Sequence, residues 1–143
     1  MPLLANDTSG AVTRKRLETY ITAREKVTAV VGVTTANGAP TAAQILDSKL
    51  FHCTPTADRT FVLPTAALII AALTDEAVGT SFQFTIVNVA TAYEVVVTTS
   101  AGWTITGGGY MTVFEGTSAT FLGVVTSTTE CQLYRMGSGG EVK

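Results

Sequence analysis

Short runs of alternating apolar and polar residues, separated by tight turns, fill the chain from Gly79 to Met136. From Phe82 to Ile86 every second residue is large and apolar, which is the period of two expected of a strand with one buried face. Later strands are expected at Tyr93–Thr98, Trp103–Ile105, Tyr110–Phe114, Thr117–Val125 and Glu130–Met136. Runs of this length, bounded by Gly, Ser and Thr, predict an all-β fold, an antiparallel β-sandwich or barrel.

The pattern continues upstream with further short elements. A β-branched run predicts a strand at 28–35, and Ala36-Asn37-Gly38 is a turn signal. Thr41 is positioned to cap a single helical turn, Ala42–Leu46. Two more strands are expected at Lys49–Thr54 and Arg59–Leu63.

A second short helix is predicted at Ala66–Leu73, after Pro64 and with Thr65 as its N-cap. This helix is apolar on every side and must therefore be buried on most faces. Because a small sandwich offers little cover for two faces, a neighbouring subunit is expected to supply it. The expected subunit-interface residues are Leu68, Ile69, Ile70 and Leu73.

We expect residues 1–27 to form a separate N-terminal arm and residues 28–143 to form the sandwich domain. Pro2, Asn6-Asp7 and Ser9-Gly10 favour irregular structure at the start of the arm. Within Val12–Lys26, Leu17, Tyr20, Ile21 and Arg24 follow the i, i+3, i+4, i+7 spacing of a helix. Such a segment buries too little surface to be stable alone, so it docks on the body or on another molecule, or it is a dispensable tail.

Charged residues make up 14% of the chain, against about 25% in a typical soluble domain. The mean hydropathy is +0.35. Threonine on exposed strand positions accounts for part of this composition. The favoured explanation is an oligomer, since obligate subunit interfaces resemble a domain core cut in half.

The net charge of −2 is unevenly distributed. Up to Lys26 there are five basic and three acidic residues, whereas the remainder holds four basic and eight acidic residues. Arg14-Lys15-Arg16 alone is too short to indicate nucleic-acid binding. The first residues lack the pattern of a secretory signal, and no apolar run reaches the ~20 residues of a membrane-spanning helix. We therefore expect neither a nucleic-acid nor a membrane partner.

The residues that could carry chemistry are few. His52 is the only histidine and adjoins Cys53 in a predicted strand, so their side chains point to opposite faces. Cys53 and Cys131 are expected to be buried free thiols. Gly107-Gly108-Gly109 lacks the Lys and Ser or Thr of a phosphate loop and is interpreted as a turn. We expect no enzymatic activity, no metal site and no cofactor.

Trp103 is a possible ligand platform, together with Tyr110, because an exposed aromatic ring can stack on a sugar. A single Trp on a strand more often fills the core or an interface. The packing role is therefore the favoured one.

Part of the chain resembles a β-rich module of virion proteins from tailed phages and large double-stranded DNA viruses. The resemblance is carried by Thr41–Leu46, Thr56–Ala66, Val78–Asn88, Gly102–Gly107 and Gly116–Phe121. It implies a trimeric, jelly-roll-like domain that decorates or cements a capsid or forms a fibre head. It also implies structural roles: Asp58 accepts backbone N–H groups in its turn, Arg59 pairs with a nearby acid, and Gly79 and Gly116 permit tight entries to strands.

The sequence therefore predicts a structural virion protein, a capsid decoration (cement) protein on the capsid surface, made in the host cytoplasm. It would form a homotrimer and bind the major capsid protein through its arm. The expected capsid-binding residues are Leu3, Leu4, Arg14, Lys15, Arg16, Leu17, Tyr20 and Ile21. The alternative is a fibre or spike head domain that binds host glycans at Trp103 or Tyr110.

Overall fold

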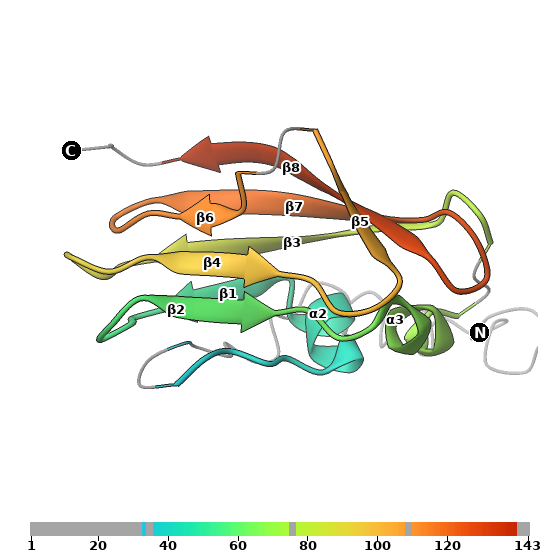
Figure 1. Cartoon of the computed structure of the whole chain (residues 1–143), viewed down its shortest axis with the longest axis horizontal. Coiled ribbons are helices and arrows are strands. Elements are labelled where there is room, and N and C mark those ends of the chain that lie inside the picture. The colour runs from blue at the N-terminus through green and yellow to red at the C-terminus, as the bar shows by residue number, and fades with distance from the viewer. Residues whose placement is uncertain (1–32, 34–35, 75–76, 108–109, 140–143) are drawn as a thin grey trace, which may run out of the picture.

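The computed structural model describes residues 33, 36–74, 77–107 and 110–139, which form two packed β-sheets with two short helices near one end (Figure 1). The helices are α2 (Ala42–Ser48) and α3 (Ala66–Ala72). The strands are β1 (Leu50–Cys53), β2 (Arg59–Val62), β3 (Ser81–Asn88), β4 (Val95–Thr98), β5 (Trp103–Thr106), β6 (Thr112–Val113), β7 (Ser118–Val125) and β8 (Cys131–Gly139). The predicted arm lies outside the described residues, as does the predicted strand at 28–35 apart from Val33.

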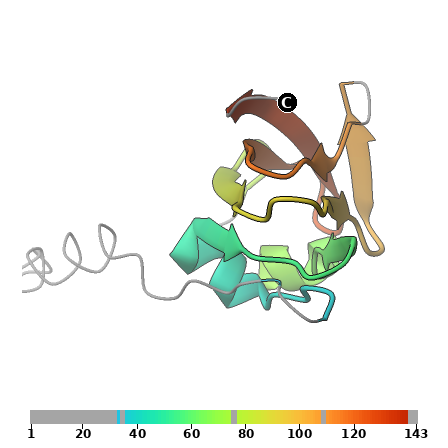
Figure 2. The same cartoon turned by 90° about the vertical axis from the view of Figure 1, so that its left-hand side faces the viewer.

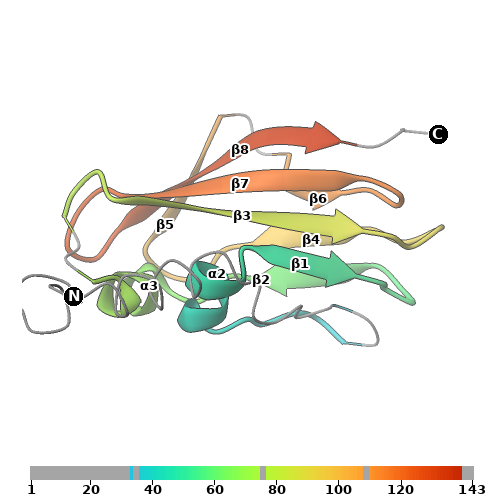
Figure 3. The ribbon, with the colours of Figure 1, turned by 180° about the vertical axis from the view of Figure 1, so that it is seen from behind.

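One sheet has five strands in the order β1-β3-β7-β8-β5, and the other has three in the order β2-β4-β6 (Figure 3). The expected β-rich, two-sheet architecture is confirmed, but the expectation that it is antiparallel is wrong in part. The pairs β1–β3, β2–β4 and β5–β8 are parallel. After β1 the chain crosses to the other sheet as β2 and then returns as β3, so β1 and β3 run side by side in the same direction, and β2 and β4 do likewise.

The core between the sheets is built on four phenylalanines. Phe51 and Phe84 come from the five-stranded sheet and Phe61 from the three-stranded one, and all three are fully or almost fully buried. The rings of Phe51 and Phe61 meet edge to face across the sheets at 4.9 Å. Phe121 stacks on Phe84 at 5.3 Å. The alternation from Phe82 to Ile86 thus predicted the buried face of β3 correctly, with Phe82 half-buried at its start.

Both helices begin at the caps expected from the sequence. Thr41 and Gln44 form a reciprocal capping box, in which the Thr41 hydroxyl accepts the Gln44 N–H and the Gln44 side chain accepts the Thr41 N–H. The box satisfies two otherwise free N–H groups at the start of α2, and the helix continues to Ser48, beyond the single turn predicted. Thr65 caps α3 through the Leu68 N–H, and Leu73, predicted as its last residue, is the C-cap.

Each open side of the sandwich is closed by a specific contact. On one side, Gly38 pairs with the free edge of β2, donating to Thr60 O at 2.8 Å and accepting from Val62 N at 2.7 Å. On the other side, Arg135 of β8 donates from Nη1 to the carbonyl oxygens of Tyr110 and Thr112, at 2.8 Å and 2.7 Å. Arg135 therefore joins the two sheets and covers the exposed edge of β6, which would otherwise present free acceptors.

Candidate functional site

The structure leaves the predicted capsid-binding residues of the arm outside the part that it describes. Within the described part, no group of three or more His, Cys, Asp or Glu side chains could hold a metal ion. His52 is exposed and Cys53 is buried, on opposite faces of β1 as predicted. The features of the described part considered below are the two thiols and the exposed surfaces.

Both cysteines are free and buried, as the sequence predicted. Burial raises the pKa of the Cys53 thiol, an effect that a backbone hydrogen bond with Val33 partly offsets. Burial also raises the pKa of the Cys131 thiol. Because the thiolate is the reactive form, both groups are held in a state of low reactivity.

Helix α3 differs from its prediction, because the chain itself covers one of its faces. Ala66 and Ile69 are fully buried, and Ile70 is 6% exposed, so Ile69 has no surface left for a second subunit. The prediction had assumed that a small sandwich could not cover the helix, but the ends of β5, β7 and β8 supply that cover through Trp103, Val125 and Cys131.

The opposite face of α3 is open. Leu68 is 57% exposed, and Ala67, Ala71 and Ala72 are exposed beside it. We call these four residues the helix face. Val78 is 70% exposed and lies on the side of Ile70, and Thr74, directly after the helix, is also exposed. Of the four residues predicted at a subunit interface, Leu68 is the one that remains available, with Leu73 half-buried.

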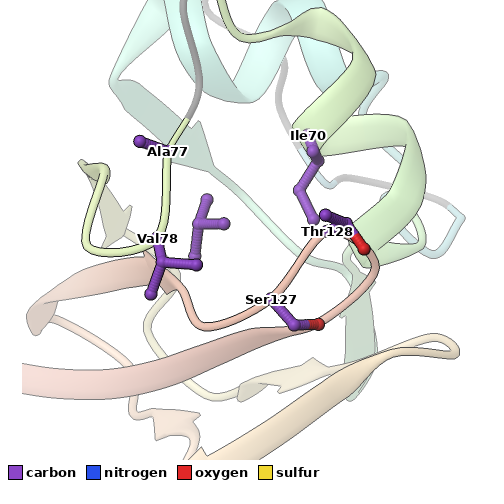
Figure 4. A pocket seen from close by; sticks show the side chains of 6 residues that line it. Ile70, Ala77, Val78, Ser127 and Thr128 are labelled. Carbon is purple, nitrogen blue, oxygen red and sulfur yellow. The ribbon is translucent and has the colours of Figure 1, made fainter.

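A small hollow lies between Val78 and α3, with a volume of about 100 Å³ (Figure 4). Its wall is formed by Ile70, Ala77, Val78, Val125, Ser127 and Thr128. Pockets that hold small molecules usually measure about 300–1,000 Å³. Among the described residues, the wall consists of four apolar side chains and the two hydroxyl-bearing residues Ser127 and Thr128.

Trp103 has the packing role that the sequence favoured. Its ring is half-buried and packs both on the core between the sheets and on the smaller buried group formed by Ala66, Ile70, Val125 and Cys131. It meets the Phe82 ring edge to face at 6.2 Å. Its indole N–H donates to the carbonyl of Pro64 at 2.8 Å. The indole therefore joins β5 to the segment that begins α3, and its N–H is not available to a ligand.

Tyr110, the second predicted platform residue, is 77% exposed. Its side chain faces solvent, while its carbonyl oxygen accepts one of the Arg135 hydrogen bonds. The structure therefore separates the roles of the two aromatic residues: Trp103 packs inside, and Tyr110 presents its ring outside.

A second candidate surface lies at the end of the sandwich opposite α3, where the loops β1–β2, β3–β4 and β6–β7 meet (Figures 1 and 2). Three large apolar side chains are partly exposed there: Val89 at 44%, Tyr93 at 41% and Phe114 at 37%. Three carboxylates accompany them, those of Asp58, Glu94 and Glu115. We call these six residues the loop end.

Hydrogen bonds connect the loops of the loop end. Asp58 Oδ1 accepts the Glu94 N–H at 3.1 Å, so the acceptor role expected for Asp58 is confirmed, but it acts on another loop and not within its own turn. Buried Asn88 donates from Nδ2 to the carbonyls of Tyr93 and Val113, at 2.8 Å and 3.1 Å. Since Tyr93 precedes β4 and Val113 belongs to β6, one side chain fixes the positions of two loops.

The carboxylates of the loop end form no ion pair with a basic residue of the described part, and Arg59 likewise has no acidic partner there. The expected pairing of Arg59 with a nearby acid is therefore not found among the described residues. The sequence analysis missed the loop end, although a signal existed. Tyr93-Glu94 and Phe114-Glu115 are both an aromatic residue followed by an acid next to a strand, a pattern that recurs at two loops of one end.

Comparison with known proteins gives no match: no family model, no curated protein and no solved structure is significantly similar to this chain. Within the described residues, no helix has the length and apolar character needed to cross a membrane. The function must therefore be argued from the two surfaces and the charge distribution.

Proposed function

We propose that this protein is a structural virion protein, a capsid decoration (cement) protein that stabilises a viral shell as a homotrimer. The proposal joins the resemblance of Thr41–Met136 to virion modules with the properties of the described surface. In this assignment the sandwich is the trimeric body, located on the outer face of the capsid, and the arm is the segment that contacts the major capsid protein.

The observation that carries the proposal is the helix face. Its four exposed side chains, of which Leu68 is 57% exposed, are all apolar, as in the core of a subunit interface. Exposed apolar surface of this kind marks interaction sites in soluble proteins. Association through the helix face would leave the loop end of each subunit pointing away from the interface (Figure 1).

A trimer suits the mechanical task of a decoration protein. Packaged DNA loads the joints between capsomers, and a three-fold body with three arms adds contacts across several joints at once. Multivalent attachment then gives strong retention from contacts that are individually weak. In the arm, apolar anchors such as Leu17 and Tyr20 contribute about 1.5–3 kcal/mol each if fully buried, more than the ~0–1 kcal/mol of exposed ion pairs.

Co-sedimentation with shells assembled without this protein tests the assignment. We expect the full chain to bind, and deletion of Met1–Lys26 to leave a folded trimer that binds much more weakly. Replacing Leu17 and Tyr20 with Ala should weaken binding more than replacing Arg14, Lys15 and Arg16 with Gln. If the truncated trimer binds as tightly as the full chain, the arm is not the attachment segment.

One observation favours a second candidate function, a fibre or spike head that binds host glycans. Tyr110 is 77% exposed, and Arg135 holds its backbone carbonyl, so the ring is presented to solvent from an anchored backbone and can stack on a sugar. Glycan-array binding that is lost in Tyr110→Ala, but retained in Tyr93→Ala, would support this function over decoration.

A further inference from the structure

We propose that the arm docks on the loop end of its own body, through the stretch from Arg14 to Arg24. The inference concerns the free protein and does not depend on the virion role. It names an interaction surface that the function proposed above leaves unused.

The first argument is the composition of the loop end. Val89, Tyr93 and Phe114 expose between 37% and 44% of their surface at one end of the molecule. The loops that carry them are fixed by the Asn88 and Asp58 hydrogen bonds. A preformed apolar surface of this kind can bind a segment with little cost for its own ordering.

The second argument is charge complementarity. The carboxylates of Asp58, Glu94 and Glu115 lie in the same loops as the apolar residues and have no basic partner in the described part. The stretch from Arg14 to Arg24 carries four basic residues and one acidic residue. At helical spacing it also presents Leu17, Tyr20 and Ile21 on one face, which matches the apolar residues of the loop end.

The third argument is where the described chain begins. The Val33 carbonyl accepts the Thr54 N–H at 2.9 Å, and Thr54 opens the β1–β2 loop of the loop end. Arg24 precedes Val33 by nine residues in the sequence. An extended chain spans roughly 3.3–3.6 Å per residue, so the stretch can reach the loop end of its own molecule, at a high effective concentration.

The test is paramagnetic relaxation in the full chain, with a spin label attached to Thr22→Cys. The native cysteines are buried, so the added thiol takes the label selectively. We expect loss of the amide signals of Val89, Glu94 and Glu115, retention of those of the helix face, and recovery at high salt, which screens the charges.

A matched pair of variants separates the loop end from a general charge effect. The double variant Asp58→Asn with Glu94→Gln removes two negative charges from the loop end. It keeps a side-chain oxygen at position 58 that can accept the backbone N–H of residue 94. Asp47→Asn with Glu130→Gln removes the same two kinds of charge away from the loop end. The first pair should restore the loop-end signals, the second should not, and neutralising Arg14, Lys15 and Arg16 should act like the first.

Three results would overturn the inference. The first is signal loss centred on the helix face, or no signal loss at all. The second is equal recovery in the two matched pairs. The third is signal loss that persists in a mixture of isotope-labelled chains without the spin label and spin-labelled chains without the isotope, because the occupant would then be the arm of a second copy.

Discussion

The ring of Phe82 in β3 lies over the backbone of Gly123, its register partner in β7. A Cβ atom at Gly123 would lie 2.3 Å from Phe82 Cζ. The ring has little freedom to move away, because it also packs edge to face on Trp103 at 6.2 Å. Position 123 therefore requires glycine, because a side chain there would push the Phe82 ring away from Trp103.

Gly123→Ala is expected to lower the free energy of unfolding by about 1–3 kcal/mol, the usual cost of overpacking. The matched control is Gly137→Ala in the neighbouring strand β8, where an added Cβ meets nothing within 4 Å. Urea titration of both variants measures the difference. Equal stabilities would show that the Phe82 ring yields without cost.

Lys49 is predicted to be a site of avoidable backbone strain. It is the C-cap of α2 with φ 57°, and it is the one residue other than glycine with a positive φ in the described part. Lys49→Gly should therefore raise the free energy of unfolding by about 0.5–1 kcal/mol. A left-handed residue with a side chain costs roughly 1–2 kcal/mol, and the larger conformational entropy that glycine loses on folding offsets part of this gain. Lys49→Ala retains the strain and should give no gain in chemical denaturation; a gain as large as that of glycine would contradict the explanation.

Arg135 is predicted to stabilise the joint between the sheets. Arg135→Gln removes two charge-assisted hydrogen bonds and should cost about 1.5–3 kcal/mol in the free energy of unfolding. The exposed β6 edge should also increase aggregation, measured by static light scattering. Arg59→Gln is the control, because the buried Nε of Arg59 has no hydrogen-bond partner. If both variants lose a comparable free energy of unfolding, Arg135 stabilises the fold by general packing and not by its two hydrogen bonds to carbonyls.

The two buried thiols give a prediction for labelling. In native buffer, Cys53 and Cys131 should react slowly with a thiol reagent, and both should react rapidly once denaturant is added. An exposed thiol introduced by Thr104→Cys is the positive control. Rapid reaction of both native thiols without denaturant would contradict their burial, and no reaction in denaturant without a reductant would indicate a disulfide.

The same thiols make stability depend on alkaline pH. Their pKa values are raised in the folded state, so the folded protein keeps protons that the unfolded chain releases. The free energy of unfolding should therefore be steady below the ordinary thiol pKa of about 8.5 and should fall as the pH rises above it. Replacing both cysteines with Ala should flatten this slope in urea titrations at several pH values.

Local features of the fold could be predicted from the sequence because short-range rules determine them. The alternation around Phe84, the Thr41 and Thr65 caps and the turn at Gly116, whose φ is 67°, all follow from neighbouring residues. Strand pairing could not be predicted in this way. The parallel partnership of β1 with β3 depends on the crossing of the chain between sheets, which leaves no mark in the alternation of either strand.

The candidate surfaces likewise depend on contacts between residues far apart in the sequence, which could not be predicted. The exposure of Leu68 and the burial of Ile69 depend on where Trp103 and Val125 pack, and both lie more than thirty residues further along the chain. The edge strand β6 was predicted to be longer, at Tyr110–Phe114. Its backbone instead turns its outer carbonyls to Arg135, a contact between residues more than twenty positions apart.

The central claim is that the body associates as a homotrimer through the helix face, and its most direct test is the mass of the full chain in solution. Light scattering coupled to size exclusion should give about three times the 14.9 kDa chain mass. Leu68→Glu should reduce that mass to one chain, because it places a charge in an apolar interface, while Thr104→Glu on β5 should leave it unchanged. A mass of one chain for the unaltered protein at micromolar concentration would contradict the claim.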